Sequence, residues 1–171
     1  MPNTLTLDAF NHLPPPAATA ALSRCCGARR WVEQMVGRRP FGTYDDLLSA
    51  ADESFANLTR EDWLEAFSHH PKIGDLDSLR ARFARTADWA AGEQSGASDA
   101  SDATLRALAE ENETYQRRFG YIFIVCATGK SAEQMRELLG RRLANDPEAE
   151  LETAAAEQMK ITHLRLRKLI P

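Results

Sequence analysis

Residues 70–75, His-Pro-Lys-Ile-Gly-Asp, carry the side chain of this sequence that is best suited to chemistry. Proline fixes its own φ and disfavours helical backbone at the preceding residue, so we expect His70 just past the end of a helix. Gly74 permits a close turn or a close backbone approach to a ligand. An imidazole on a stiff turn, with an ordinary pKa near ~6.5, suits general acid–base catalysis. Taken alone, a histidine without a catalytic role is the commoner case, and the chain has four.

A second polar group lies at Glu93 and Gln94, flanked by small residues and by Gly92 and Gly96. A glutamate accepts hydrogen bonds, whereas a glutamine both donates and accepts them. Together the two side chains can recognise a urea-like or imide-like edge. The alternative is a solvated helix end that precedes a polar loop, and the residues alone leave both interpretations open.

Other chemistries lack the residue spacing that they need. His69 and His70 are adjacent, and adjacent residues do not face one metal ion from a helix, so we expect no metal site. A nucleophilic serine in a GxSxG turn and a glycine-rich phosphate loop are both absent from the sequence. If the chain is an enzyme, we expect it to work without a cofactor.

Helical periodicity dominates the elements that must position these residues. Thr43 and Thr59 are expected helix N-caps, and the helix after Thr59 delivers His70. Apolar residues at three- and four-residue steps predict one long helix from Leu105 to Cys126. The remaining expectations are a helix at 76–85, a polar loop at 95–102, a helix capped by Ser131 that runs to about 143, and a last helix that starts at Asp146-Pro147 and runs to about 169. We therefore predict one all-α domain over residues 1–171, a helical bundle of about eight to nine helices.

Composition excludes several classes of function. The chain has 171 residues, of which 43% are hydrophobic and 27% charged, and its formal net charge is −4. No basic field is present that would hold nucleic acid or an anionic membrane. Three cysteines, two of them adjacent and none in a CxxC motif, indicate reduced thiols. We expect a cytoplasmic protein, since the sequence shows neither a signal-peptide pattern nor an apolar run of the ~20 residues that a membrane span needs.

Several motifs, in order over nearly the whole chain, carry a family resemblance. They are Arg39-Pro40-Phe41, the segment 70–75, Glu93-Gln94-x-Gly96, Asn112-x-x-Tyr115-x-x-Arg118-Phe119-Gly120-Tyr121-x-Phe123-Ile124, Arg142-Leu143-x-Asn145, and the last stretch from Glu150-Leu151 through Glu157-Gln158-Met159-Lys160-Ile161-Thr162-x-Leu164-Arg165-Leu166. With these motifs the chain resembles the 2-oxo-4-hydroxy-4-carboxy-5-ureidoimidazoline (OHCU) decarboxylases of purine catabolism.

The resemblance implies an all-helical homodimer without metal or organic cofactor. It implies that His70 is the catalytic imidazole, and we assign Glu93 to the C4 hydroxyl of the substrate as a second catalytic group. Arg165 is our candidate for a substrate-clamping arginine. The family commonly carries a serine where this chain has Ala90, which removes a hydroxyl donor from the expected site. The other residues implied to line the site are Pro71, Gln94 and the backbone around Ile124, Val125, Cys126 and Ala127.

The implied reaction is decarboxylation of OHCU to (S)-allantoin. Three alternatives remain at this stage. The first is a degenerate relative that binds ureides without turnover, for which the loss of the serine at Ala90 is the reason. The second is a non-catalytic helical binding or regulatory protein; a helix-turn-helix regulator would need a basic recognition helix, against which the net charge argues. The third is an unrelated histidine-dependent lyase or hydrolase.

Overall fold

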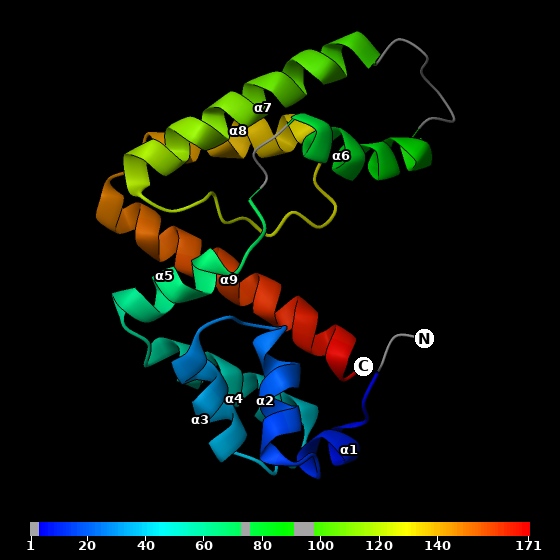
Figure 1. The fold of residues 1–171 in the computed structure, drawn as a ribbon, viewed down its shortest axis with the longest axis vertical. Coiled ribbons are helices and arrows are strands. Elements are labelled where there is room, and N and C mark those ends of the chain that lie inside the picture. The colour runs from blue at the N-terminus through cyan, green and yellow to red at the C-terminus, as the bar shows by residue number, and fades with distance from the viewer. Residues whose placement is uncertain (1–3, 73–75, 91–97) are drawn as a thin grey trace. The chain divides into compact units, whose positions relative to one another are not determined.

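The structure, a computed structural model, describes residues 4–72, 76–90 and 98–171 (Figure 1). These residues form nine helices and no strand, which confirms the all-α prediction and the expected number of helices. The chain divides into two compact units. Unit 1 comprises residues 1–70, 124–126 and 154–171, and unit 2 comprises residues 71–123 and 127–153. That the whole chain is one domain stays a prediction.

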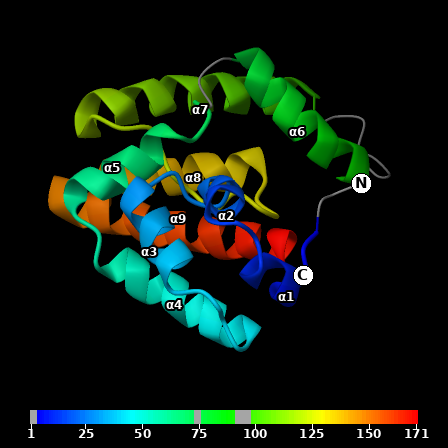
Figure 2. The same ribbon diagram turned by 60° about the horizontal axis from the view of Figure 1, so that its bottom comes forward.

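Unit 1 consists of five helices and the larger part of a sixth. Trp31 and Met35 are fully buried in its core, and the indole of Trp31 donates a hydrogen bond to the carbonyl of Ala51 at 3.0 Å. The packing of α3 against α2, α4 and α5 can be followed in Figures 1 and 2. The helices are α1 (Leu7–Asn11), α2 (Pro15–Ser23), α3 (Arg29–Gly37), α4 (Tyr44–Ala56), α5 (Arg60–Ser68) and the part of α9 (Pro147–Leu169) that follows residue 153.

The helix starts in both units follow local side-chain chemistry. Thr43 and Thr59 each accept a hydrogen bond from the backbone of the third helical residue, whose carboxylate bonds back to the cap residue. Ser131 makes the same reciprocal arrangement at the start of α8 (Ala132–Leu143). Such a capping box satisfies backbone N–H groups that a helix start leaves unpaired. All three predicted N-caps are confirmed.

Unit 2 contains α6 (Leu76–Ala90), α7 (Ser98–Phe119), α8 and the first turns of α9. Helix α7 packs along α8, side by side in Figures 1 and 2. Within unit 2, the buried carboxylate of Glu150 accepts hydrogen bonds from the hydroxyl of Tyr115 and from the guanidinium of Arg142. Asn145 donates to the other carboxylate oxygen at 2.8 Å. This network ties α7, α8 and the start of α9 together.

The predicted long helix to Cys126 is wrong. Helix α7 ends at Phe119, because Gly120 adopts a φ of +85° that a side chain disfavours and that ends helices. Residues 122–127 are neither helix nor strand. Two neighbouring predictions also need correction: the helix expected to stop at residue 85 continues to Ala90, and the second half of the expected polar loop, from Ser98, is already helical.

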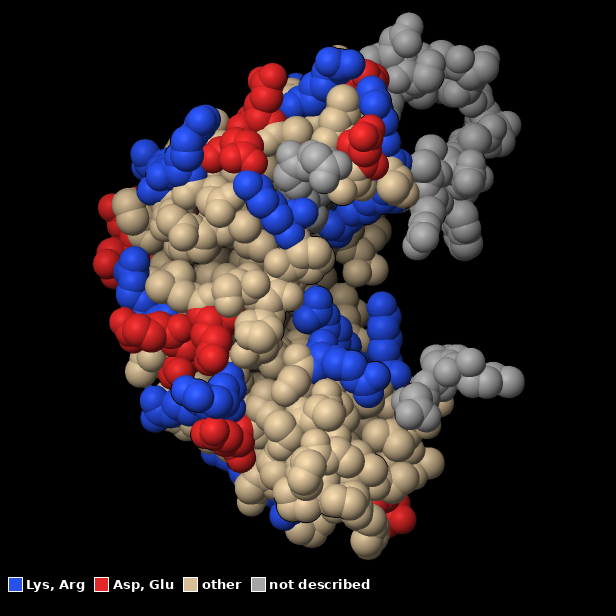
Figure 3. Space-filling model, viewed as in Figure 1, with Lys and Arg blue, Asp and Glu red and all other residues tan. Residues whose placement is uncertain are grey.

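The face drawn in Figure 3 carries both acidic and basic side chains. The two kinds are mixed along its left edge, and a small group of basic side chains gathers near the right centre of the view. That face presents no broad basic surface of the kind that binds nucleic acid. Among the described residues, none of the helices combines the length with the apolar character that crossing a bilayer requires.

Candidate active site

His70 lies where the sequence predicts it, directly after the C-terminus of α5. His69 caps the helix, and the backbone N–H of His70 donates to the carbonyl of Phe67 at 3.2 Å. The α2–α3 connection approaches this turn closely: a Cβ on Gly27 would lie 2.4 Å from Cγ of His69, far inside van der Waals contact. Only glycine permits that approach. The turn is therefore held from within unit 1.

The imidazole of His70 is half-buried and hydrogen-bonded. Its Nε2 lies 2.5 Å from Oε1 of Gln158, which is fully buried on α9. The amide Nε2 of Gln158 in turn donates to Oγ1 of Thr162 at 3.2 Å, one helical turn further along α9. Thr162 is also fully buried, and its hydroxyl lies 2.9 Å from the carbonyl of Gln158 and 3.4 Å from that of Cys25. Three polar side chains thus form a chain that begins at the imidazole.

Arg165 brings a positive charge to the same part of unit 1. It follows Thr162 by three residues on α9, and its Nη1 donates to the carbonyls of Arg24 and Cys25 at 3.4 and 3.5 Å. Both hydrogen bonds are long, so they hold the guanidinium weakly. A guanidinium recognises carboxylates well because its donors match both carboxylate oxygens.

The surroundings of His70 lower its pKa from the ordinary value. Burial is the largest cause, since it disfavours the charged imidazolium. The hydrogen bond to Gln158 acts in the opposite direction, while the charges of Arg165 and His69 lower the pKa further. His70 is therefore neutral at pH 7 and available to accept a proton. Burial also raises the pKa of the neighbouring Cys25 and Cys26 thiols to about 11, so they stay protonated.

Helix α9 also contacts the segment 124–126, which lies outside regular secondary structure. The carboxylate of Glu157, the residue before Gln158, accepts a hydrogen bond from the backbone N–H of Cys126 at 2.7 Å. Lys160 donates to the same carboxylate group at 2.5 Å. Ile124 is buried, whereas Cys126 is partly exposed. One helix therefore positions both the imidazole and a stretch of backbone outside regular secondary structure.

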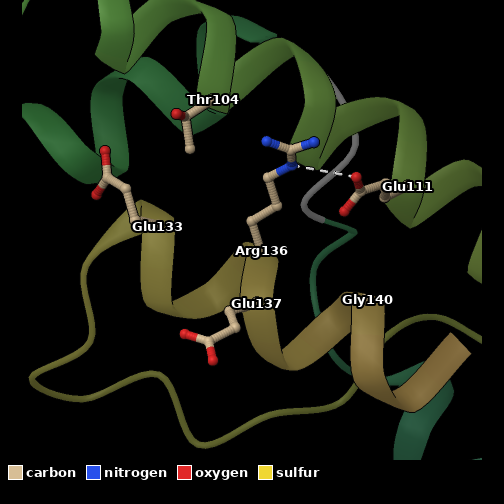
Figure 4. A pocket seen from close by; sticks show the side chains of 6 residues that line it. All are labelled: Thr104, Glu111, Glu133, Arg136, Glu137 and Gly140. Carbon is tan, nitrogen blue, oxygen red and sulfur yellow. Dashed lines mark hydrogen bonds and ion pairs between the residues drawn. The ribbon is translucent and has the colours of Figure 1, made fainter.

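A hollow on unit 2 has a different character. It has a volume of about 350 Å³ and lies between α7 and α8. Figure 4 shows Arg136 turned toward Glu111, its partner at 3.1 Å, while the carboxylates of Glu133 and Glu137 point elsewhere. In the described part of the chain no group of three or more His, Cys, Asp and Glu side chains could hold a metal ion. The described lining therefore offers no metal centre: Glu133 and Glu137 are exposed on α8, and Glu111 is partly buried and paired with Arg136.

Comparison with known proteins identifies the family. The sequence model described as OHCU decarboxylase matches residues 11–167. The chain belongs to the OHCU decarboxylase family. It is 43% identical over 148 residues to the uric acid degradation bifunctional protein TTL of Arabidopsis thaliana, a match over 85% of this chain and 45% of that protein. This chain thus spans less than half the length of the bifunctional relative.

Two further relatives match nearly end to end. The 2-oxo-4-hydroxy-4-carboxy-5-ureidoimidazoline decarboxylase of Haloferax volcanii is 29% identical over 163 residues, 95% of this chain and 94% of that one. A crystal structure of OHCU decarboxylase in the presence of (S)-allantoin is 38% identical and superimposes with a TM-score of 0.69, covering 86% of this chain and 94% of that chain. The OHCU decarboxylase fold thus extends over most of the molecule.

The residues expected from the family resemblance are divided between the two units, and some lie outside the described residues. His70 and Arg165 lie in unit 1, as does the segment of Ile124, Val125 and Cys126. Pro71 and Ala127 belong to unit 2. Ala90 is the last residue of α6. Glu93 and Gln94 lie outside the described residues, as does the 73–75 part of the His-Pro motif.

Gln158, Thr162 and Glu157 were not among the predicted site residues, although all three lie in a stretch that resembles the OHCU decarboxylases. A signal was present in their spacing. Residues 158, 162 and 165 recur at four and three residues, which places polar side chains on one stripe of a helix. A glutamine and a threonine that share a stripe with apolar residues are buried polar groups, and such groups need partners.

Proposed function

We propose that this protein decarboxylates OHCU to (S)-allantoin and CO2. The observation that carries the proposal is the setting of His70, a half-buried imidazole with a lowered pKa on the His-Pro turn beside Arg165. Membership of the OHCU decarboxylase family supports the choice of substrate. The decarboxylase from Haloferax volcanii and the structure with (S)-allantoin support the same reaction.

The chemistry of the substrate explains why no cofactor is required. OHCU carries its carboxylate on C4, next to a C=N bond. When the C4–carboxylate bond breaks, its electron pair forms a C4–C5 double bond, and the imine nitrogen takes up the displaced pair and a proton. The C4 hydroxyl then loses its proton and C5 gains one, which gives the carbonyl and the stereocentre of allantoin. Decarboxylases whose substrates lack such a group use a cofactor, for example pyridoxal phosphate or thiamine diphosphate, as the electron sink.

The protein has to orient the carboxylate, stabilise the developing charge and control proton transfer to one face. We assign proton exchange with the C4 hydroxyl to neutral His70 and recognition of the substrate carboxylate to Arg165. Glu93 would bond the C4 hydroxyl, and Gln94 the ring and ureido groups. Pro71, Ala90 and the backbone of residues 124–127 would line the site. These assignments rest on the family resemblance and, for His70 and Arg165, on their surroundings in unit 1.

The test follows circular dichroism while OHCU decays. OHCU is generated from urate by urate oxidase and hydroxyisourate hydrolase, with and without this protein. Uncatalysed decay gives racemic product, so a fast and lasting (S)-allantoin signal reports catalysis. His70→Ala is expected to lower turnover by about 10²–10⁴-fold, the usual contribution of a general acid–base group.

His12→Ala is the matched control. His12 is an exposed histidine on the C-cap of α1, where its Nδ1 lies 2.8 Å from the carbonyl of Asp8. This variant should turn over OHCU at the wild-type rate. A His70→Ala protein with a near-normal rate would contradict the role of the imidazole, whereas wild-type protein without any (S)-allantoin signal would contradict the decarboxylase.

One alternative deserves its own experiment, because Ala90 replaces the usual serine of the family. A degenerate relative would bind (S)-allantoin, as measured by calorimetry, but leave OHCU to decay at the uncatalysed rate. If that is the outcome, Ala90→Ser restores the missing hydroxyl, and recovered turnover would locate the defect at this residue.

The proposal also includes a homodimer, a cytoplasmic location and activity without a cofactor. The homodimer and the absence of a cofactor come from the family resemblance. The location draws support from Cys25, Cys26 and Cys126, since none of the three forms a disulfide. Light scattering behind a sizing column tests the dimer, and activity after exhaustive chelation tests independence from metal.

A further inference from the structure

We infer that Gln158, oriented by Thr162, holds neutral His70 as the Nε2–H tautomer, so that Nδ1 is the ring nitrogen that exchanges a proton with the substrate. Gln158 is a positioning residue in this scheme, since it acts on the reaction through His70. The inference deepens the proposed function, because it names the reacting atom of the imidazole on which that function rests.

The hydrogen bonds of Thr162 determine which group donates and which accepts at each step between Thr162 and His70. The Thr162 hydroxyl has one proton and lies 2.9 Å from the carbonyl of Gln158 and 3.4 Å from that of Cys25. Carbonyl oxygens only accept, so the hydroxyl donates its proton there. Its oxygen is then left to accept from the group of Gln158 that lies 3.2 Å away, and that group has to be the amide nitrogen.

The amide of Gln158 transmits this direction to the imidazole. With its nitrogen turned to Thr162, its oxygen faces Nε2 of His70 at 2.5 Å. An amide oxygen cannot donate, so Nε2 has to carry the proton. A neutral imidazole carries one proton, and Nδ1 is therefore the basic nitrogen.

Burial makes the arrangement selective. Gln158 and Thr162 are both fully buried, so no solvent offers an alternative partner. Turning the amide would bring its oxygen to Thr162, whose proton would then have to leave the carbonyl of Gln158 at 2.9 Å for an acceptor at 3.2 Å, and this favours the orientation observed. The opposite tautomer of His70 would set an unprotonated Nε2 against the oxygen of Gln158, and two acceptors repel each other.

The experiment is a long-range ¹H–¹⁵N correlation spectrum of wild-type protein labelled with ¹⁵N-histidine, at a pH well above the ordinary histidine pKa of ~6.5. The His70 signals are assigned by their loss in His70→Ala. A protonated Nε2 and an unprotonated Nδ1 are expected, and a protonated Nδ1 would overturn the inference. Because this measurement uses the wild-type protein without substrate, its outcome is independent of whether the protein decarboxylates OHCU.

Kinetics of two variants complete the test. Thr162→Val removes the hydroxyl that orients Gln158, so mixed tautomers of His70 and a fall in kcat of about three- to tenfold are expected, with little change in KM. Thr162→Ser keeps the hydroxyl and should recover both the wild-type tautomer and kcat. A Thr162→Val protein that is folded by circular dichroism, with wild-type tautomer and wild-type kcat, would contradict the role of Thr162.

Discussion

At His70, burial and hydrogen bonding act on the same proton in opposite directions. Burial disfavours the imidazolium, and the charge of Arg165 on α9 and of the adjacent His69 adds to this effect. The acceptor Gln158 favours the imidazolium, but it does not outweigh the other causes, so the pKa falls below its ordinary value. A base must be neutral before it accepts a proton, and the lowered pKa extends that state to more acidic solution.

The pH dependence of kcat/KM should therefore have its acidic limb below pH ~6.5, the ordinary pKa of histidine. Arg165→Gln removes the cation and raises the His70 pKa, so the limb should move toward neutral pH, whatever the variant does to the maximal rate. The measurement is initial rate of (S)-allantoin formation across pH, beside an NMR titration of His70. An acidic limb above 6.5, or one that Arg165→Gln leaves in place, would contradict this account.

The lowered pKa of His70 also makes the free energy of unfolding depend on pH. The pKa of His70 is about 6.5 in the unfolded chain and lower in the folded protein, so the unfolded chain takes up a proton first as the pH falls. The stability that neutral His70 contributes is therefore complete above pH ~6.5 and is lost as the pH falls through the pKa of the folded protein.

The sequence indicated His70 but could not supply its partner. A proline disfavours helical backbone at the residue before it, so the pair His70-Pro71 is enough to predict the end of the helix. Gln158 lies 88 residues away from His70 along the chain. Which polar residue of α9 meets the imidazole depends on how α5 and α9 pack, and no local spacing encodes that contact.

The same division between local and distant causes holds for the helices. Their starts were predictable because Thr43, Thr59 and Ser131 cap them through bonds to residues three positions on. The end of α7 was missed because apolar residues continue the helical spacing through Phe123 and Cys126. Phe123 and Ile124 are buried outside regular secondary structure, and burial calls for apolar residues there as it does in a helix. Gly120 was the signal that should have outweighed the periodicity.

Replacing Gly120 tests this reading of the helix end. Its φ of +85° is disfavoured for residues with a Cβ, so Gly120→Ala should lower the free energy of unfolding by about 1–2 kcal/mol. Urea denaturation followed by far-UV circular dichroism gives this difference. Gly140→Ala is the matched control, because Gly140 lies inside α8 with open space around its Cβ position. That variant should gain about 0.5–1 kcal/mol, the helix preference for alanine over glycine.

If Gly120→Ala were as stable as the wild type, the end of α7 would not depend on positive φ at this residue. If Gly140→Ala also lost stability, a general intolerance of unit 2 to alanine would explain both results.

On the scale of the whole molecule, α9 links the two units by chain continuity. Its first turns, with Glu150, belong to unit 2, and its remainder, with Gln158 and Arg165, belongs to unit 1. The Glu150 carboxylate is fully buried and pairs with Arg142 at 2.6 Å. Burial and this carboxylate raise the pKa of Tyr115 far above its ordinary value, so the phenol stays protonated and donates. The start of the helix that carries the site residues is thereby anchored in unit 2.

Glu150→Gln should break that anchor. It leaves the buried guanidinium of Arg142 without an anion, for which a loss of about 3–5 kcal/mol of unfolding free energy is expected in urea denaturation. Glu152→Gln, an exposed position two residues on, is the matched control and should change stability by no more than about 0.5 kcal/mol. Because α9 is one continuous helix, amide exchange measured by mass spectrometry should also quicken in residues 154–169. Unchanged protection there, beside a large loss of stability, would mean that the C-terminal part of α9 is held by unit 1 alone.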